Sequence, residues 1–511
     1  MGHRKTPFLP DFMTTRSTVF TPPWAAEMHG AVPAQAVESP AASVFTPFSE
    51  PSPELSPQFS IDQPLVLRGG ECIIPFQGVH TMDIRIENGK IFAIGESVST
   101  DNARVVEING KYVAPGVVDP HVHLGIFSDF NVELVTETRS ALLNGVTTLG
   151  LYLNAEGSYL PLLDDYIAAI NAKSNCDIFV HLAIMNQTQL QEIPVYHSRY
   201  GINSFKTWMC GIPGLIPDVE DDFLLDLMAA VAALPGRPVL NVHAENHRAV
   251  SRATAHQKKA DPHITSLASW EKSHPGFGEA EAIQRAAFLA GQSGVQVYFV
   301  HLSAKESVDV ARRLKPGSGN LFFESTSPYL TLSLADDLNY LNKMIPPIRY
   351  PEDQAELWKG LEENIIDTIG TDHTPMTVDE KKQGPGLWDF PPGYPAVGTH
   401  LPSLLNKARM ECFPLEKLFE KISAVPARIF GLYPKKGSLL PGADADLVII
   451  DPFVEKKASP EIAGSRSDYC LHQGKTLAGW PVGIVKSGRI ISRKQDLDSP
   501  DKSAGGVYLK R

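Results

Sequence analysis

Residues 113–123, VAPGVVDPHVH, give the clearest indication of the fold. This stretch is an apolar, β-branched run that ends in two histidines, His121 and His123. Two residues separated by one position point to the same side of an extended strand, so both imidazoles can bind one metal ion. Ligand-type side chains at a strand end are typical of the mouth of a parallel barrel. The stretch therefore predicts a barrel strand that carries two metal ligands.

Four later apolar runs also carry a ligand-type side chain at or near their ends. These side chains are Lys206, His243, His301 and Asp372, in the runs INSFKTWM, PVLNVHAE, QVYFVHLS and NIIDTIGTDHTP. Because the carboxyl ends of parallel strands meet at one face of a barrel, we expect the four to converge with the two histidines of the first run. The sequence therefore predicts a metal site with six ligand positions.

Eight β-type runs alternate with stretches of helical periodicity, which indicates a parallel (β/α)8 barrel of the TIM type. The eight runs are GVVDPHVHL, GVTTLGLYL, DIFVHLAI, INSFKTWM, PVLNVHAE, QVYFVHLS, NLFFESTS and NIIDTIGTDH. A doubly wound open sheet is the alternative, but it would leave the six ligand-type residues without a common centre. We therefore predict a barrel over residues 114–429.

Short β patterns lie on both sides of the predicted barrel in the sequence. Residues 61–113 and 430–495 are expected to pair into one small β-sandwich domain beside the barrel, and NGK at 88–90 and at 109–111 is typical of hairpin turns. Residues 1–60 are rich in Pro, Ser and Ala and are interpreted as a disordered tail. Residues 496–511 are expected to form a flexible C-terminal tail.

Composition excludes several functional classes for this 511-residue chain. The net charge of -12 argues against a nucleic-acid-binding surface, which would be basic. No apolar run reaches the roughly 18 residues that a membrane span requires. The five cysteines are widely spaced and form no CxxC pair, which favours a reducing compartment, and we expect a cytoplasmic protein.

Lys206 is the least expected member of the predicted metal site. A lysine cation with a pKa near 10.4 is a poor ligand. It becomes a ligand if its amine reacts with CO2 to give a carbamate (N6-carboxylysine), whose two oxygens can bridge two divalent ions. Such ions supply hydroxide at neutral pH, because zinc lowers the pKa of bound water to about 7. Asp372 is then placed to act as general base and acid, which predicts hydrolysis of an amide.

At this point the chain resembles the amidohydrolase superfamily, in its cyclic-amidohydrolase branch. The motifs HVH, SFKTWM, HAEN, VHLS and GTDHTP are most similar to those of dihydropyrimidinases and hydantoinases, and the likeness covers about residues 62–493. The resemblance implies two zinc ions per subunit, a small cyclic amide, imide or ureide as substrate, and a homo-oligomer, commonly a tetramer. It implies that His121 and His123 bind one ion, shared with Lys206 and Asp372, and that His243 and His301 bind the other.

The sequence departs from that family in the substrate pocket. Dihydropyrimidinases carry an oxyanion-stabilising tyrosine five residues after the lysine, where this chain has Gly211, and Tyr329 and Tyr394 are candidates to replace it. We expect the glycine to leave an enlarged, apolar pocket that favours bulky ring substituents. The residues predicted to line the pocket are Phe127, Trp208, Gly211, Ile212, Leu215, Ile345 and Tyr394.

Two alternative functions stay open at this level. The segment KTWMCGIPG is similar to that of some allantoinases, which hydrolyse a ureide. Scaffold proteins related to dihydropyrimidinase keep the fold and lose the ligands, so a non-catalytic assembly role is the other alternative. Retention of all six ligand positions favours the enzyme.

Overall fold

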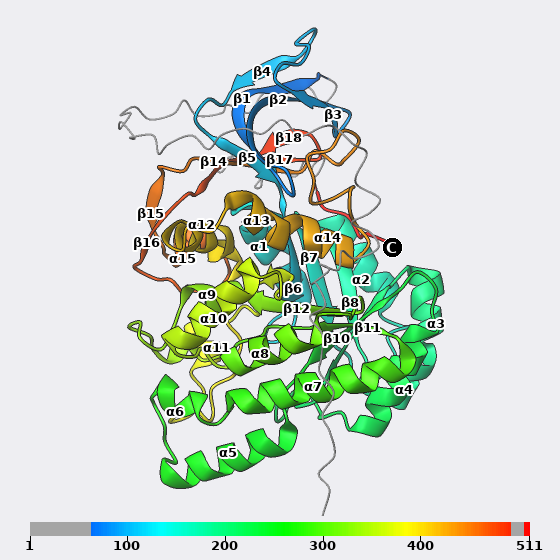
Figure 1. The fold of residues 1–511 in the computed structure, drawn as a ribbon, viewed down its shortest axis with the longest axis vertical. Helices are drawn as coiled ribbons and strands as arrows, with labels where there is room; N and C mark the ends of the chain where they lie inside the picture. The colour runs from blue at the N-terminus through cyan, green and yellow to red at the C-terminus, as the bar shows by residue number, and fades with distance from the viewer. Residues whose placement is uncertain (1–62, 492–504) are drawn as a thin grey trace, which may run out of the picture.

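The computed structural model describes residues 63–491 and 505–511, arranged as a barrel with a sheet stacked on one end (Figure 1). The predicted disordered tail at residues 1–60 lies outside the described residues. None of the helices in the described ranges is long and apolar enough to cross a membrane.

Eight parallel strands form the barrel, as the sequence predicts. In the order in which they pair, they are β6 (Val117–His123), β7 (Val146–Leu153), β8 (Asp177–Ala183), β9 (Ser204–Trp208), β10 (Val239–His243), β11 (Gln296–Phe299), β12 (Leu321–Thr326) and β13 (Thr368–Gly370). Nearly every residue in these strands is buried, because helices cover the outer face and side chains fill the interior. The prediction of a TIM-type barrel is confirmed.

The barrel closes between its last and first strands through one carboxylate. Asp119 of β6 accepts hydrogen bonds from the backbone N–H of Thr371 at 3.1 Å and from the Thr371 hydroxyl at 2.6 Å. The backbone N–H of His123 donates to the carbonyl of His373 at 2.7 Å. The closure therefore fixes the end of β6 against the residues that follow β13, and both segments carry predicted metal ligands.

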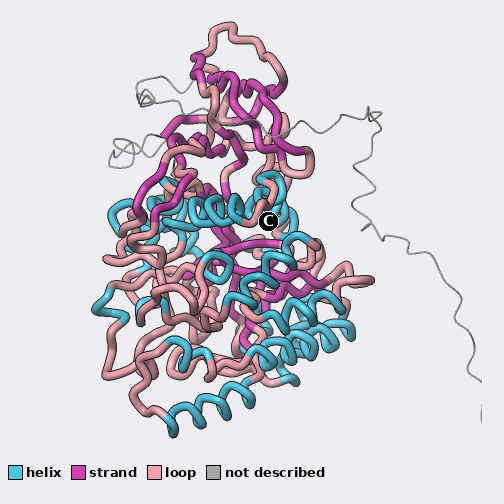
Figure 2. The backbone as a smooth tube through the Cα atoms, turned by 60° about the vertical axis from the view of Figure 1, so that its left-hand side comes forward, coloured by secondary structure: helices cyan, strands magenta, loops and turns pink. Residues whose placement is uncertain are grey.

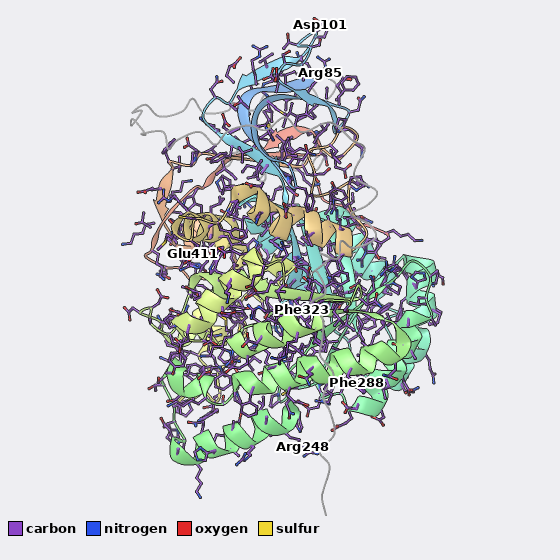
Figure 3. All side chains as sticks on the ribbon, in the orientation of Figure 1. Arg85, Asp101, Arg248, Phe288, Phe323 and Glu411 are labelled. Carbon is purple, nitrogen blue, oxygen red and sulfur yellow. The ribbon has the colours of Figure 1, made fainter. Side chains whose placement is uncertain are left out.

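Helices surround the barrel, and Figure 2 shows the strands inside them. The longer helices are α1 (Phe130–Leu143), α2 (Leu163–Lys173), α3 (Gln187–Tyr200), α4 (Asp221–Ala232), α5 (His247–Ala260), α7 (Gly276–Ser293), α8 (Lys305–Leu314), α10 (Pro351–Glu362) and α12 (His400–Met410). Short helices are α6 (Leu267–Glu271), α9 (Ser327–Thr331), α11 (Val378–Lys381), α13 (Leu415–Phe419), α14 (Val425–Ile429) and α15 (Pro460–Ala463). The exposure of side chains differs between the barrel strands and the outer surface of the helices, as expected. Phe323 of β12 is fully buried, whereas Phe288 on the outside of α7 is 72% exposed (Figure 3).

The flanking sheet takes strands from both ends of the chain. Its strands are β1 (Leu65–Ile74), β2 (Gly78–Glu87), β3 (Lys90–Gly95), β4 (Arg104–Glu107), β5 (Tyr112–Pro115), β14 (Leu447–Ile450), β17 (Pro481–Lys486) and β18 (Arg489–Ile491). Strand β5 joins the two ends, because it pairs with β1 on one side and with β14 on the other. A separate two-stranded antiparallel sheet is made by β15 (Glu455–Lys457) and β16 (Thr476–Ala478). The division into 61–113 with 430–495, and 114–429, stays a prediction.

The two NGK segments differ in their roles. Asn88 and Gly89 have positive φ angles of 50° and 74° and connect the antiparallel pair β2 and β3, as a hairpin turn requires. The segment 109–111 instead connects β4 to β5, which both pair in parallel with β1. The expectation of a hairpin there is wrong, because the chain continues in the same direction after the turn.

The end of the chain is packed against the barrel, so the expectation of a flexible tail is wrong for residues 505–511. The backbone of Ile178 in β8 donates to the carbonyl of Val507 at 2.9 Å and accepts from the N–H of Leu509 at 2.8 Å. Arg511 is half-buried, and its guanidinium donates to the carbonyl of Val180 at 2.8 Å and stacks over the ring of Phe179. Backbone hydrogen bonds to β8, the buried side chain of Leu509 and the contacts of Arg511 hold the segment in place.

Candidate metal centre

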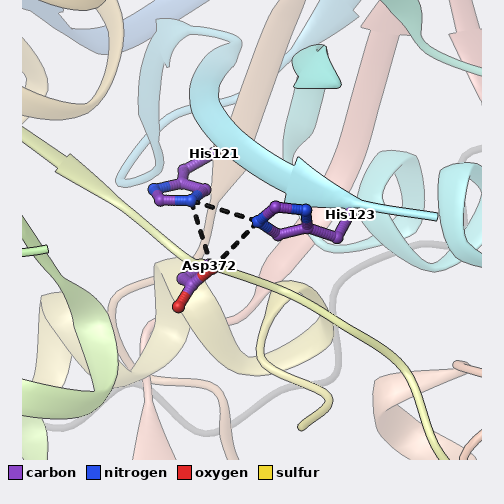
Figure 4. Close-up of side chains that lie close together, drawn as sticks. All are labelled: His121, His123 and Asp372. Atoms are coloured by element: carbon purple, nitrogen blue, oxygen red, sulfur yellow. Dashed lines mark hydrogen bonds and ion pairs between the residues drawn. The ribbon is translucent and has the colours of Figure 1, made fainter. Parts of the chain in front are cut away.

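The first part of the site is a triangle of donor atoms at the mouth of the barrel. The Nε2 atoms of His121 and His123 lie 3.3 Å apart, and Oδ1 of Asp372 lies 3.1 Å from the first and 3.3 Å from the second (Figure 4). Zinc–nitrogen and zinc–oxygen bonds of about 2.0–2.1 Å put tetrahedral ligands roughly 3.3–3.4 Å apart. The three donors are therefore already spaced as the ligands of one divalent ion.

Two residues of the site adopt a backbone conformation that L-amino acids usually avoid. His301 has a φ of 46° and Asp372 a φ of 53°, both in the left-handed region. Such residues cost on the order of 1 kcal/mol each and persist where the surrounding structure imposes them. Each stands two residues after the end of a barrel strand, and the unusual turn lets their side chains line the pocket.

Lys206 lies in the middle of β9 and is fully buried. Its Nζ atom is 5.1 Å from the ring centroids of Tyr152 and Trp208. Burial lowers the pKa of this amine to about 7, against the opposite effect of Asp372 and Glu324. A substantial fraction of the amine is therefore neutral near pH 7, which is the form that can react with CO2.

His243 and His301 form the second part of the site. Nδ1 of His243 lies 2.9 Å from Nε2 of His301. The other nitrogen of His243, Nε2, contacts Oε2 of Glu245 at 2.9 Å, and Oε1 of the same carboxylate contacts Nδ1 of His274 at 3.1 Å. This chain of contacts orients the His243 ring, and His274 is a member that sequence reasoning missed, because it stands 29 residues after Glu245.

A second buried carboxylate orients the first histidine. Oε2 of Glu324, at the middle of β12, lies 3.0 Å from Nδ1 of His121 and accepts the backbone N–H of His301 at 3.2 Å. This leaves Nε2 of His121 facing Asp372. Glu324 and Glu245 are both buried, and each fixes the orientation of a histidine as carboxylates do around metal sites.

The charges of the site favour a cation. Burial acts to lower the pKa of His121, but the carboxylates of Glu324 and Asp372 outweigh it and raise that pKa to about 9. Burial lowers the pKa of His123 to about 4. Without a metal ion, His121 is therefore the imidazole that keeps its proton near neutral pH. A divalent ion bound at the same place would supply the positive charge that the carboxylates of Glu324 and Asp372 favour.

A pocket at the mouth of the barrel brings most of the predicted residues together. It is lined by all six predicted metal ligands, by the predicted pocket residues Phe127, Trp208, Ile212, Leu215, Ile345 and Tyr394, and by Ile126, Asn154, Ile216, Thr374, Pro392 and Gly393. Apolar side chains dominate the wall around the donor atoms. Four residues of this lining were not predicted from the sequence: Ile126, Asn154, Ile216 and Thr374.

Gly211 does not line this pocket, and it leaves no open space. A Cβ atom at this position would lie 2.2 Å from the carbonyl oxygen of Ile216 and 2.5 Å from the carbonyl carbon of Pro217. The expectation that Gly211 frees the volume of a phenol ring is therefore wrong. The loop after β9 turns back over its own start and fills that space with backbone.

The two tyrosines considered as replacements have different surroundings. The Tyr394 hydroxyl donates to Oδ2 of Asp372 at 3.1 Å. The Tyr329 hydroxyl donates instead to the carbonyl of Pro346 at 2.6 Å. Of the two, only Tyr394 belongs to the pocket lining, so its hydroxyl lies at the donor atoms and the hydroxyl of Tyr329 supports a neighbouring turn.

Comparisons with known proteins agree on one family. Residues 112–491 match the amidohydrolase family. The chain is 30% identical to the L-hydantoinase of Paenarthrobacter aurescens over 442 residues, which covers 83% of this chain and 94% of the relative. It is 32% identical to the D-hydantoinase of Streptomyces coelicolor over 477 residues, covering 87% and 97%. The crystal structure of dihydropyrimidinase from Brevibacillus agri is similar with a TM-score of 0.80 at 25% identity, covering 88% of this chain and 98% of that one.

Proposed function

Because this chain belongs to the amidohydrolase family and is a hydrolase of cyclic amides, we propose that it opens the ring C–N bond of a hydantoin, dihydropyrimidine, imide or ureide at a centre of two zinc ions. The observation that carries this proposal is the convergence of six donor side chains on one pocket. The relatives are enzymes, which favours catalysis over the alternative of a non-catalytic assembly protein.

The donor set fits such a centre. His121, His123 and Asp372 would hold one ion, His243 and His301 the other, and Lys206 would contribute to both as N6-carboxylysine. When bound, the two ions would lower the pKa of water to about 7 and polarise the substrate carbonyl. The lowered pKa of the buried Lys206 amine supports the carbamate, because the neutral amine is the form that reacts with CO2. A second argument is that an unmodified ammonium would repel both cations.

Asp372 is the proposed proton carrier. Its two oxygens face different groups: Oδ1 faces the histidines of β6 and Oδ2 accepts the hydroxyl of Tyr394. Burial acts to raise the pKa of Asp372, but His121 and His123 outweigh it and hold that pKa well below its usual range. The carboxylate is therefore ionised at neutral pH and can take a proton from the attacking water and pass it to the leaving nitrogen.

Tyr394 is the proposed positioning residue of this carboxylate. Its hydroxyl lies within hydrogen-bond distance of Oδ2, and its ring forms part of the pocket wall. By donating to Oδ2 it orients the oxygen that accepts the proton. It also places a hydroxyl at the donor atoms, in a chain that has no side chain at position 211 to do so.

The pocket residues are proposed to hold the substrate ring. Phe127, Trp208, Ile212, Leu215 and Ile345 present apolar surface around the donors. Such surface favours an apolar ring substituent by about 25 cal/mol per Å² buried. We further propose a homo-oligomer, a tetramer by family resemblance, in the cytoplasm.

The deciding experiment combines metal analysis with a substrate panel. Purified protein should contain about two zinc ions per chain and should open the ring of at least one of hydantoin, an aryl hydantoin, dihydrouracil or allantoin, measured as loss of ring absorbance. Protein loaded with two ions that opens none of these rings would contradict the proposed substrate class. Full activity after exhaustive chelation would contradict the metal mechanism.

A further inference from the structure

Three side chains outside the six-residue centre meet beside the pocket: Cys210, Asp218 and His247. Cys210 stands two residues after β9, Asp218 stands near the end of the loop between β9 and α4, and His247 is the first residue of α5. The ligand atoms of the three lie within 4.8 Å of one another. Thus the two ends of one loop and the first residue of a helix contribute one donor each.

Two of these donors are held in place by local contacts. Oδ1 of Asp218 accepts the backbone N–H of Gly211 at 2.7 Å, and Oδ2 lies 2.9 Å from Nδ1 of His247. The Cys210 side chain is buried, whereas the side chains of Asp218 and His247 are 35% and 30% exposed. The sulfur of Cys210 therefore lies on the buried side of the cluster, and solvent reaches the cluster from the side of Asp218 and His247.

The chemistry of the set selects one class of ligand. A thiolate, an imidazole and a carboxylate are donors for a borderline ion such as zinc, whereas magnesium and calcium require oxygen ligands. We propose that Cys210, Asp218 and His247 bind a third zinc ion, with water completing the tetrahedron. Small side-chain rotations bring donors from within 4.8 Å to the roughly 3.3–3.8 Å separations of tetrahedral zinc ligands.

Binding at this site requires loss of a proton. Burial raises the pKa of the Cys210 thiol, with further contributions from Glu245 and Asp218 in the same direction. The thiol is thus protonated in the metal-free protein, and the ion must displace that proton. Affinity at this site is therefore expected to rise with pH.

The ion would fix one wall of the substrate pocket. The loop after β9 is closed by two backbone hydrogen bonds, Ile212 N–H to Ile216 O at 2.9 Å and Ile216 N–H to Ile212 O at 2.8 Å. Ile212, Leu215 and Ile216 of this loop line the pocket. An ion held at both ends of the loop and by α5 would tie that wall to the helix, so its loss should raise KM more than it lowers kcat.

The test uses cadmium, which gives an ultraviolet charge-transfer band only when it binds a thiolate. The six-residue centre contains no cysteine, so cadmium bound there stays silent in this band. Titration of the purified holoenzyme in a Cys412→Ser background should give a saturable band at one cadmium per chain. This background removes Cys412, which is exposed and free.

Two further variants in the same background decide the assignment. Cys210→Ser should abolish the band, and His247→Ala should weaken cadmium binding at least tenfold, while ring-opening activity at saturating substrate stays within threefold for His247→Ala. A band that persists in Cys210→Ser would overturn the proposal. So would unchanged affinity in His247→Ala, which remains informative if the cysteine variant does not fold, or the absence of any band at millimolar cadmium.

Discussion

The hydroxyl of Tyr394 donates to Oδ2 of Asp372 at 3.1 Å, while Oδ1 of the same carboxylate points to the two histidines of β6. One carboxylate thus has a metal-facing and a pocket-facing oxygen. The arrangement links the loop after α11 to the end of β13, two segments 22 residues apart. It provides the basis for the first prediction.

Tyr394→Phe should lower kcat roughly 10- to 100-fold and leave zinc content unchanged, because the ring remains and only the donor to Oδ2 is lost. Removing a donor to the ionised form raises the pKa of Asp372, so the acid limb of the kcat/KM profile should move to higher pH. Tyr329→Phe is the matched control, since it also removes a buried hydroxyl but one that bonds Pro346. Equal effects of the two variants would refute the positioning role.

Lys206→Ala should lose activity by more than 1,000-fold and bind less zinc, because no carbamate can form. Short carboxylic acids such as acetate or propionate should restore part of the activity by taking the place of the carbamate oxygens. Mass spectrometry of the native enzyme should show the added mass of CO2 on this lysine. Fully active protein with an unmodified Lys206 would contradict this prediction.

Asp372→Asn should be nearly inactive while the fold survives, since an amide cannot accept the proton. Circular dichroism should be unchanged, because asparagine has nearly the same shape and the hydrogen bonds of Asp119 to Thr371 that close the barrel remain. Turnover within tenfold of wild type would assign proton transfer to another group.

Gly211→Ala should destabilise the protein by about 1–3 kcal/mol, because the new Cβ meets backbone atoms that cannot move independently. Gly291→Ala on α7 is the control, because nothing lies within 4 Å of its added Cβ and alanine favours a helix. Thermal unfolding of both variants tests the difference. An unchanged Tm for Gly211→Ala would mean that the loop has room to relax.

Arg511→Met should cost about 1–3 kcal/mol of stability, because buried carbonyls of β8 and of Phe430 lose their donor. Lys510→Met, at the exposed neighbouring position, should change stability by no more than about 0.5 kcal/mol. Chemical denaturation of the two variants measures both values. Similar unfolding midpoints would show that the end of the chain adds nothing to the barrel.

The eight barrel strands could be predicted from the sequence alone, and the same sequence patterns indicated six candidate donor side chains. Each strand is an apolar, β-branched run, and five of the six candidate donors stand at or near the end of a run, with Lys206 in the middle of β9, so the information is local. The rule that parallel strands end at one face of a barrel then brings the six together without knowledge of any contact. The flanking sheet followed in the same way from alternating patterns at both ends of the chain.

The surroundings of those donor side chains could be known only from the tertiary structure. Whether Gly211 opens space depends on the backbone of residues 216–217. Whether Tyr394 or Tyr329 reaches Asp372 depends on where the loop after α11 and the short helix α9 pack on the barrel. Residues 505–511 pack beside β8, and no pattern in their own sequence predicts this contact. Strand formation reflects the periodicity of neighbouring residues, whereas these contacts join residues far apart in the chain, and only the packed fold determines which of them meet.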